Sequence, residues 1–247
     1  MRAYMSDIYI LMNRYNRDAY FASSLEALLK IKDKKELAVK SKLLEQYVID
    51  NDNPMLAFRL AIELDDRLIR TTKLQNFIIE TGDARYILKF AWNIKRTNVK
   101  KLQEAIMKYG NIIQITKFGC FIRGADRSTI EDLIVKSNSA KSAYLYLRCV
   151  KSCDVNKLKT IILHSKRPRY LFALAKVTKN KKDLEKIQEL IIESPSNIYV
   201  RLYAIYIKGA DIKKLEDRII ATKNVEEMKK FAKAVKSPRL EKLCLLF

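Results

Sequence analysis

Apolar residues recur along the C-terminal two thirds of the chain with a period of about 28 residues. Within each period they are spaced three and four residues apart, which places them on one face of an α-helix. Each period has one aromatic residue or leucine at the same place, called its anchor below. The six anchors are Phe90, Phe118, Tyr146, Leu174, Tyr203 and Phe231. Their spacings of 28, 28, 28, 29 and 28 residues predict an amphipathic first helix in every period.

Further columns of like residues flank the anchors. An apolar residue precedes each anchor by three positions, and a mostly small residue follows it directly, which lets a neighbouring helix approach closely. The preceding residues are Ile87, Ile115, Ala143, Leu171, Val200 and Met228. The following residues are Ala91, Gly119, Leu147, Ala175, Ala204 and Ala232.

A second helix is expected after a short turn. Asp126, Asp154 and Asp211 occupy its N-cap, with Asn98 and Asp183 as looser candidates, while Gly124 and Gly209 suit the C′ position that closes the first helix. Two apolar columns four residues apart run through this second helix. They are Leu102, Ile130, Leu158, Ile187, Leu215 and Leu243, then Ile106, Ile134, Ile162, Ile191, Ile219 and Phe247. Neither helix of a pair can bury its apolar face alone, so the pairs must stack.

The pattern continues upstream in weaker form. Residues 53–81 read as a degenerate unit, and residues 1–52 as N-terminal capping helices with a degenerate first unit, in which Asp33 and Glu36 form a possible capping box. Residues 53–247 are then one continuous repeat array. The 5 glycines and 4 prolines are too few for the turns of a β-sandwich or barrel. We therefore expect an all-α protein, an α-solenoid (a HEAT/armadillo-like superhelix) of about seven to eight helix pairs.

The segment Arg123-Gly124-Ala125-Asp126 recurs as Lys208-Gly209-Ala210-Asp211, with Lys151-Ser152-Cys153-Asp154 as a weaker copy between them. This short pattern resembles the imperfect two-helix repeats of uncharacterised proteins from large DNA viruses, phages and some bacteria. The resemblance covers roughly residues 53–247 and implies a HEAT-like α-solenoid. It implies no catalytic residue.

Positive charge is concentrated in the repeat region. The chain has a net charge of +21, but residues 1–81 contain 13 basic and 12 acidic residues, and residues 82–247 contain 36 and 16. A general drift toward lysine would affect the whole chain. The asymmetry therefore favours an anionic partner for the C-terminal two thirds.

Two columns carry this charge. The residue five positions after each anchor is always cationic: Lys95, Arg123, Lys151, Lys179, Lys208 and Lys236. These cations are expected in the last turn of each first helix, where a positive charge complements the helix dipole. The helix dipole alone is therefore one explanation of the first column.

A second column is expected in the first turn of the second helix, where the dipole disfavours a cation. It comprises Lys101, Lys157, Lys186, Lys214 and Lys242, with Thr129 in the remaining unit. Local pairing is an alternative explanation, because Glu104, Glu189 and Asp217 follow three of these lysines by three residues. Lys157 and Lys242 have no such neighbour.

Together the columns predict cations on both sides of each inter-helix turn. Repeats packed at about 10 Å would place them in a ladder about 50 Å long. Such a ladder suits the phosphates of DNA or RNA, and an acidic protein is the alternative partner. Five further cations are candidates to extend the patch onto the first helices: Arg85, Lys141, Arg148, Arg169 and Arg201. Tyrosines near them, such as Tyr144, Tyr170 and Tyr199, could stack on bases, although packing is the simpler role, and burial is expected for Trp92.

Other functions are disfavoured. No Walker, G-x-G-x-x-G or G-x-S-x-G motif is present, so no enzyme activity, cofactor or small-molecule substrate is expected. The single His164 and four cysteines without a C-x-x-C pair argue against a metal site, and free buried thiols are expected instead. No apolar run is long enough to cross a membrane. A cytoplasmic location is expected, which for a viral protein means the host cytoplasm or the virion.

Overall fold

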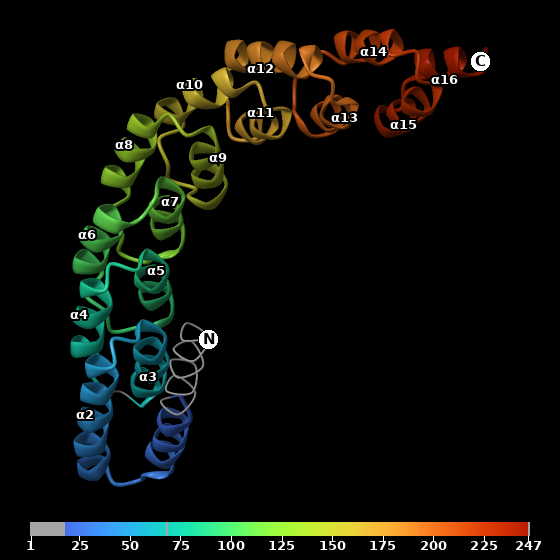
Figure 1. Cartoon of the computed structure of the whole chain (residues 1–247). Coiled ribbons are helices and arrows are strands. Elements are labelled where there is room, and N and C mark those ends of the chain that lie inside the picture. Colours follow the sequence, from blue (N-terminus) through green and yellow to red (C-terminus); the bar gives the residue numbers. More distant parts are fainter. Residues whose placement is uncertain (1–17, 68, 247) are drawn as a thin grey trace, which may run out of the picture. The chain divides into compact units, whose positions relative to one another are not determined.

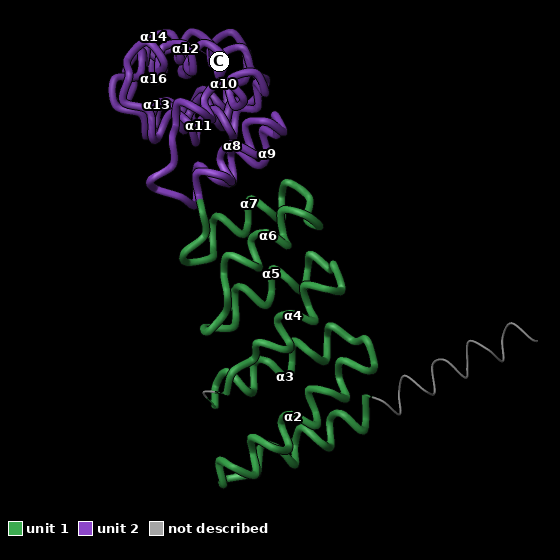
Figure 2. Tube along the Cα trace, turned by 90° about the vertical axis from the view of Figure 1, so that its left-hand side faces the viewer, with its two compact units in different colours: residues 1–126 green, residues 127–247 purple. Residues whose placement is uncertain are grey.

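The computed structural model of the chain describes residues 18–67 and 69–246. These residues form helices joined by short connections and contain no strand, so the expected all-α class is confirmed for them. The chain divides into two compact units, residues 1–126 and 127–247 (Figure 2). The expected capping helix at residues 1–20 lies largely outside the described residues, and so does Phe247.

Unit 1 consists of two rows of helices (Figure 1). Residues 18–30 are helical and precede α2. The helices that follow are α2 (Lys34–Asp50), α3 (Pro54–Asp66), α4 (Thr72–Glu80), α5 (Ala84–Asn93), α6 (Val99–Tyr109) and α7 (Ile112–Phe121). One row contains α2, α4 and α6, and the other contains α3, α5 and α7; α5 contacts both α3 and α7.

Unit 2 repeats this arrangement. Its helices are α8 (Arg127–Ser137), α9 (Ala140–Cys149), α10 (Val155–Ser165), α11 (Pro168–Ala175), α12 (Lys181–Glu193), α13 (Asn197–Tyr206), α14 (Ile212–Ala221), α15 (Val225–Val235) and α16 (Pro238–Cys244). One row contains α8, α10, α12 and α14, while α9, α11, α13 and α15 form the other and contact one another in that order. Consecutive helices of this unit, from α8 to α16, also contact one another.

The anchors form the centre of this packing. All six are at most 1% exposed, and the residues three positions before them are also buried. The two apolar columns of the second helices are buried from Leu102 to Ile219. The last pair differs, because Leu240 is buried while Leu243 remains partly exposed. Only Ser237 separates the C-cap of α15 from the first residue of α16, and the buried residue of α16 comes three positions earlier than the period predicts.

Short polar side chains define where the helices begin. Asp154 accepts hydrogen bonds from the Asn156 and Lys157 amides, and Asp211 accepts one from the Lys214 amide, as expected for N-caps. Asn98 also caps its helix. The expectation for Asp183 was wrong: Asn180 caps α12, and Asp183 lies in its first turn.

A set of buried polar residues, not expected from the sequence, joins successive helix pairs. The Gln103 side chain accepts a hydrogen bond from the Asp126 amide (2.7 Å) and donates one to the Asp126 carbonyl (3.2 Å). Gln188 makes the same two bonds to Asp211, at 2.9 and 3.2 Å. Gln75 and Glu131 each accept one bond from an amide 23 residues further along. Gln75, Gln103, Glu131 and Gln188 are called the bridging residues below.

Candidate nucleic-acid interface

The first cationic column lies in the turns rather than in the helices. Lys95, Arg123, Lys151 and Lys208 each directly follow the C-cap residue of a first helix. Lys236 is itself a C-cap, and Lys179 lies in the connection before α12. The expected position in the last helical turn was therefore wrong. The helices end earlier because the preceding Ile or Val is buried in an extended conformation, for example Ile94 with ψ 120°.

Three of these turns are closed by the same backbone hydrogen bond. The amides of Ala125, Cys153 and Ala210 donate to the carbonyl three residues earlier, at 3.2–3.4 Å. The cation is the second residue of each four-residue turn. Gly124 and Gly209 are the third residues, with φ +84°, as a type II turn requires. They lie one position beyond the expected C′ site, and they leave the cation at the exposed tip of the turn.

The second cationic column is only partly where it was expected. Lys101, Lys157 and Lys214 are each the third residue of their helix. Lys186 is the sixth residue of α12, because Asn180 starts that helix early, and Lys242 lies in the last turn of α16. The expected first-turn position is thus wrong for these two lysines.

All eleven predicted cations are exposed. Among the described residues, Lys157 is the one member with a carboxylate within 4 Å, namely Asp132 of α8 at 2.8 Å. This hydrogen bond raises the pKa of Lys157. The pairing expected for Lys214 is not formed, since Asp217 lies 2.8 Å from Arg239 instead. Local pairing therefore does not account for the second column.

Three predicted cations come together in unit 2. Lys179, Lys208 and Lys214 line a hollow of about 540 Å³ between the α11–α12 and α13–α14 connections. Lys181 also lines the hollow. It was not among the predicted cations, although three of the four residues 179–182 are lysines. The lining also includes Glu185, Glu189 and Asp211, so the hollow is basic but not free of acids.

The base of the hollow is rigidly built. Tyr203 donates a hydrogen bond to the Leu184 carbonyl at 2.7 Å, and Gln188 makes its two bonds to Asp211. Burial raises the pKa of Tyr203 to about 12, so this hydroxyl stays neutral. The lysines therefore extend from a fixed scaffold on which the position of each turn is set by a buried polar contact.

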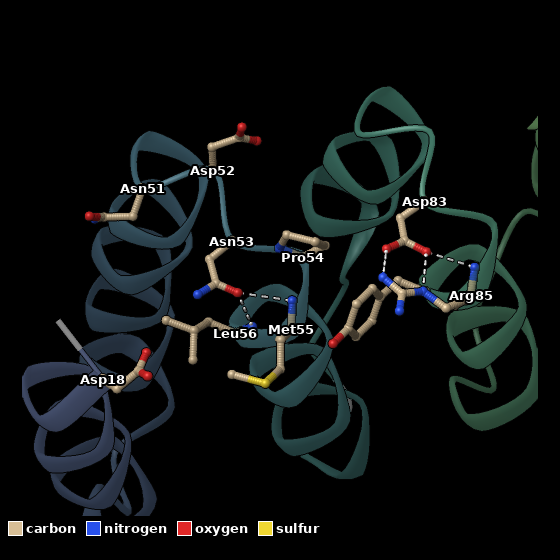
Figure 3. A pocket seen from close by; sticks show the side chains of 10 residues that line it. Asp18, Asn51, Asp52, Asn53, Pro54, Met55, Leu56, Asp83 and Arg85 are labelled. Atoms are coloured by element: carbon tan, nitrogen blue, oxygen red, sulfur yellow. Dashed lines mark hydrogen bonds and ion pairs between the residues drawn. The ribbon is translucent and has the colours of Figure 1, made fainter. Parts of the chain in front are cut away.

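Unit 1 contains a hollow of opposite character (Figure 3). It has a volume of about 420 Å³, and Asp18, Asp52 and Asp83 line it. Its one cation, Arg85, binds Asp83 through two side-chain hydrogen bonds of 3.1 and 2.7 Å. These bonds hold the pKa of Asp83 below its usual range. Arg85 is therefore paired locally, although its side chain remains 75% exposed.

The other candidate extensions on the first helices differ in their surroundings. Arg201 pairs with Glu227 at 3.3 Å, and both side chains are largely buried. Arg148 and Arg169 instead donate hydrogen bonds to the Tyr144 hydroxyl, at 3.0 and 2.8 Å. Two of the five proposed cations are thus near one another without a carboxylate partner.

Two expectations about single residue types were wrong. Trp92 is 55% exposed and stacks on Phe121 at 4.6 Å, instead of being buried in its repeat. No described cysteine is buried, and Cys149 is exposed. Trp92 and Cys149 each lie near the end of a first helix, α5 and α9 respectively.

Comparisons with protein families, curated proteins and solved structures give no match to this chain. Among the described residues, no helix is both long and apolar enough to cross a bilayer.

Proposed function

We propose that the chain is a non-catalytic basic α-solenoid that binds nucleic acid through backbone phosphates. The solenoid part of the proposal rests on the 28-residue register, the buried anchors and the bridging residues. Each bridging hydrogen bond spans 23 residues, so equivalent contacts recur between successive helix pairs within a unit. Repeats that contact only their neighbours along the chain are typical of HEAT-like solenoids.

One observation carries the functional part. All eleven predicted cations are exposed, and ten of them have no carboxylate within 4 Å in the described residues. Eight of these ten, all except Lys186 and Lys242, lie in the inter-helix turns or in the helical turn beside them. Exposed, unpaired lysines stay hydrated and mobile, which suits contact with phosphates of varying position rather than reading of base edges. Binding is therefore expected to depend strongly on salt and weakly on sequence.

The surface that we assign to this function lies in unit 2. Its four successive turns carry Lys151, Lys179, Lys208 and Lys236, and the basic hollow lies between two of them. We call these four turns the turn edge. Unit 1 contributes Lys95, Lys101 and Arg123, but its hollow is acidic, which disfavours phosphate there.

The test compares two triple variants of equal charge. In the first, Lys151, Lys179 and Lys208 on the turn edge are replaced by Gln. In the second, Lys136, Lys166 and Lys223 are replaced by Gln. These exposed lysines lie at the other ends of the second helices and make no ion pair with any residue that the structure describes. Binding to duplex DNA, single-stranded DNA and RNA is measured by fluorescence anisotropy over a range of salt concentrations.

The first triple should weaken binding at low salt and flatten the plot of log K against log salt by about two units, at about 0.7–0.9 per lost phosphate contact. The second triple should change the slope much less. Equal effects of both triples would show that net charge, not the turn edge, attracts the ligand. If the unmodified protein shows no salt-sensitive binding to any of the three, the proposal fails, and docking of an acidic protein becomes the next hypothesis to test.

A further inference from the structure

A second pocket in unit 2 combines aromatic rings with unpaired cations. It has a volume of about 590 Å³ and lies along the first helices α9, α11 and α13. The rings of Tyr144, Phe172 and Tyr199 line it. Its cations are Arg148, Lys151, Arg169 and Lys176, and its lining contains no carboxylate. It is thus more strongly basic than the hollow between the turns.

The two arginines converge on one neutral group. Both donate to the Tyr144 hydroxyl, and their guanidinium carbons lie 5.6 and 5.3 Å from the centre of its ring. The Tyr144 ring also stacks on Tyr170, with the ring centres 4.4 Å apart. No carboxylate lies within 4 Å of either arginine in the part of the chain that the structure describes. Two cations on one hydroxyl repel each other, and a phosphate bound between them would relieve that repulsion.

The rest of the pocket suits a flat apolar ring. Phe172 and Tyr199 are half-buried, with ring centres 6.0 Å apart and planes tilted by 54°. The volume lies within the roughly 300–1,000 Å³ of typical small-ligand sites, which is ample for one nucleotide. Aromatic rings beside arginines form the usual stacking platform for unpaired bases.

The pocket also adjoins the turn edge. Lys151 of the α9–α10 turn lines it, and so do Lys176 and Val177 at the start of the α11–α12 connection. Lys179 of the same connection and Lys181, the first residue of α12, line the basic hollow. A strand that follows the turn edge therefore passes the mouth of the pocket.

We propose that this pocket takes one unpaired nucleotide of a single-stranded nucleic acid, with its base against Phe172 and Tyr199 and its phosphate at Arg148 and Arg169. The inference rests on the proposed function and adds a preference to it. A base in a duplex is stacked and paired, so entering the pocket would require it to leave the helix. The protein should therefore bind single strands more tightly than duplexes of the same sequence.

The experiment uses the full chain, a short fluorescein-labelled oligothymidylate and a duplex containing the same strand, titrated at one salt concentration. Phe172→Leu and Tyr199→Leu remove a ring but keep apolar bulk. Tyr109→Leu is the control, because Tyr109 lies in α6 of unit 1, is 41% exposed and does not line the pocket. Circular dichroism checks that each variant remains folded.

Each pocket variant should weaken single-strand binding roughly 5- to 100-fold, as for the loss of one base-stacking contact, and leave duplex binding and the control unchanged. Equal loss on both ligands, or no loss on the single strand, would overturn the inference while leaving the proposed function standing.

Thymidine 5′-monophosphate, followed by NMR line broadening, separates the two proposals further. The unmodified protein should bind it, and Phe172→Leu should not. Binding of the mononucleotide without salt-sensitive binding of any polymer would refute the proposed function but keep the pocket. Binding of neither would refute both.

Discussion

Glu131 is the one bridging residue that carries a charge, and replacing it by Gln should stabilise the protein. Its carboxylate accepts a long hydrogen bond of 3.4 Å from the Asp154 amide. Gln103 at the equivalent place makes a shorter bond of 2.7 Å and also donates to a carbonyl, which a carboxylate cannot do. Glu131→Gln therefore gains a donor for the Asp154 carbonyl and removes a buried charge.

The expected gain is about 1 kcal/mol from the added hydrogen bond, since such bonds contribute about 0.5–1.5 kcal/mol net. Burial raises the pKa of Glu131, which shows that the cost of desolvation exceeds the attraction of nearby Lys157. The folded protein thus holds this proton more tightly than the unfolded chain does. Stability is then lost as the pH rises from the unfolded pKa through the folded one.

Thermal unfolding followed by circular dichroism measures this effect. At neutral pH, Glu131→Gln should raise the melting temperature by about 2–4 °C, the shift expected for about 1 kcal/mol in a chain of this size. The difference from the unmodified protein should shrink as the pH falls through the raised pKa of Glu131. Gln103→Glu is the reciprocal variant and should lower the melting temperature at neutral pH, because its second oxygen would face the Asp126 carbonyl.

The reasoning would be refuted if Glu131→Gln were neutral or destabilising at neutral pH while Gln103→Glu was tolerated. That result would mean that the bridge contributes through shape alone. A gain that stays constant over the whole pH range would show that the added hydrogen bond matters and the buried charge does not.

Three further predictions concern the helix pairs. Phe118→Ala should lower the free energy of unfolding by about 3–5 kcal/mol, because its side chain is fully buried, and a near-neutral result in chemical denaturation would contradict the anchor assignment. Gly209→Ala should lower the free energy of unfolding by about 1–2 kcal/mol through the φ of +84° alone, since an added Cβ meets no atom within 4 Å. Gly209→Asn should lower it less, because Asn adopts positive φ more readily, and equal losses would argue against a backbone cause. Asp154→Ala should cost about 0.5–2 kcal/mol by removing an N-cap, which Asp154→Ser should largely restore in the same denaturation assay.

The periodicity of apolar residues predicted the helices and their buried faces well, because burial repeats with the same spacing as the sequence. It misplaced Lys186 and Lys242, because counting from an anchor assumes that the helices begin and end at fixed distances from it. Helix α11 ends one residue after its anchor Leu174, whereas α9 ends three residues after Tyr146, so α12 begins early. Only two residues separate α15 from α16, so α16 also begins early. Capping residues were the better guide, although Asn180 and Ser237 were overlooked.

The candidate site was predicted in its charges but not in its pockets. Exposure of the two lysine columns follows from their place outside the apolar stripes. The cluster around Tyr144 depends on Arg169, 25 residues away, and such a contact requires the packing of neighbouring helices to be known. The bridging residues did leave a signal: a Gln or Glu directly follows the buried apolar residue of the second helix at Gln103, Glu131 and Gln188.

The exposed stack of Trp92 on Phe121 gives the protein a built-in optical reporter. Trp92 is the only tryptophan in the chain, so all indole emission comes from one place in unit 1. The two rings belong to α5 and α7 and are nearly parallel, with 13° between their planes. Any event that separates these two helices must break the stack and alter the emission. Fluorescence therefore follows a single junction between helix pairs, whereas circular dichroism follows every helix, and a difference between their unfolding curves would reveal parts of the chain that melt independently.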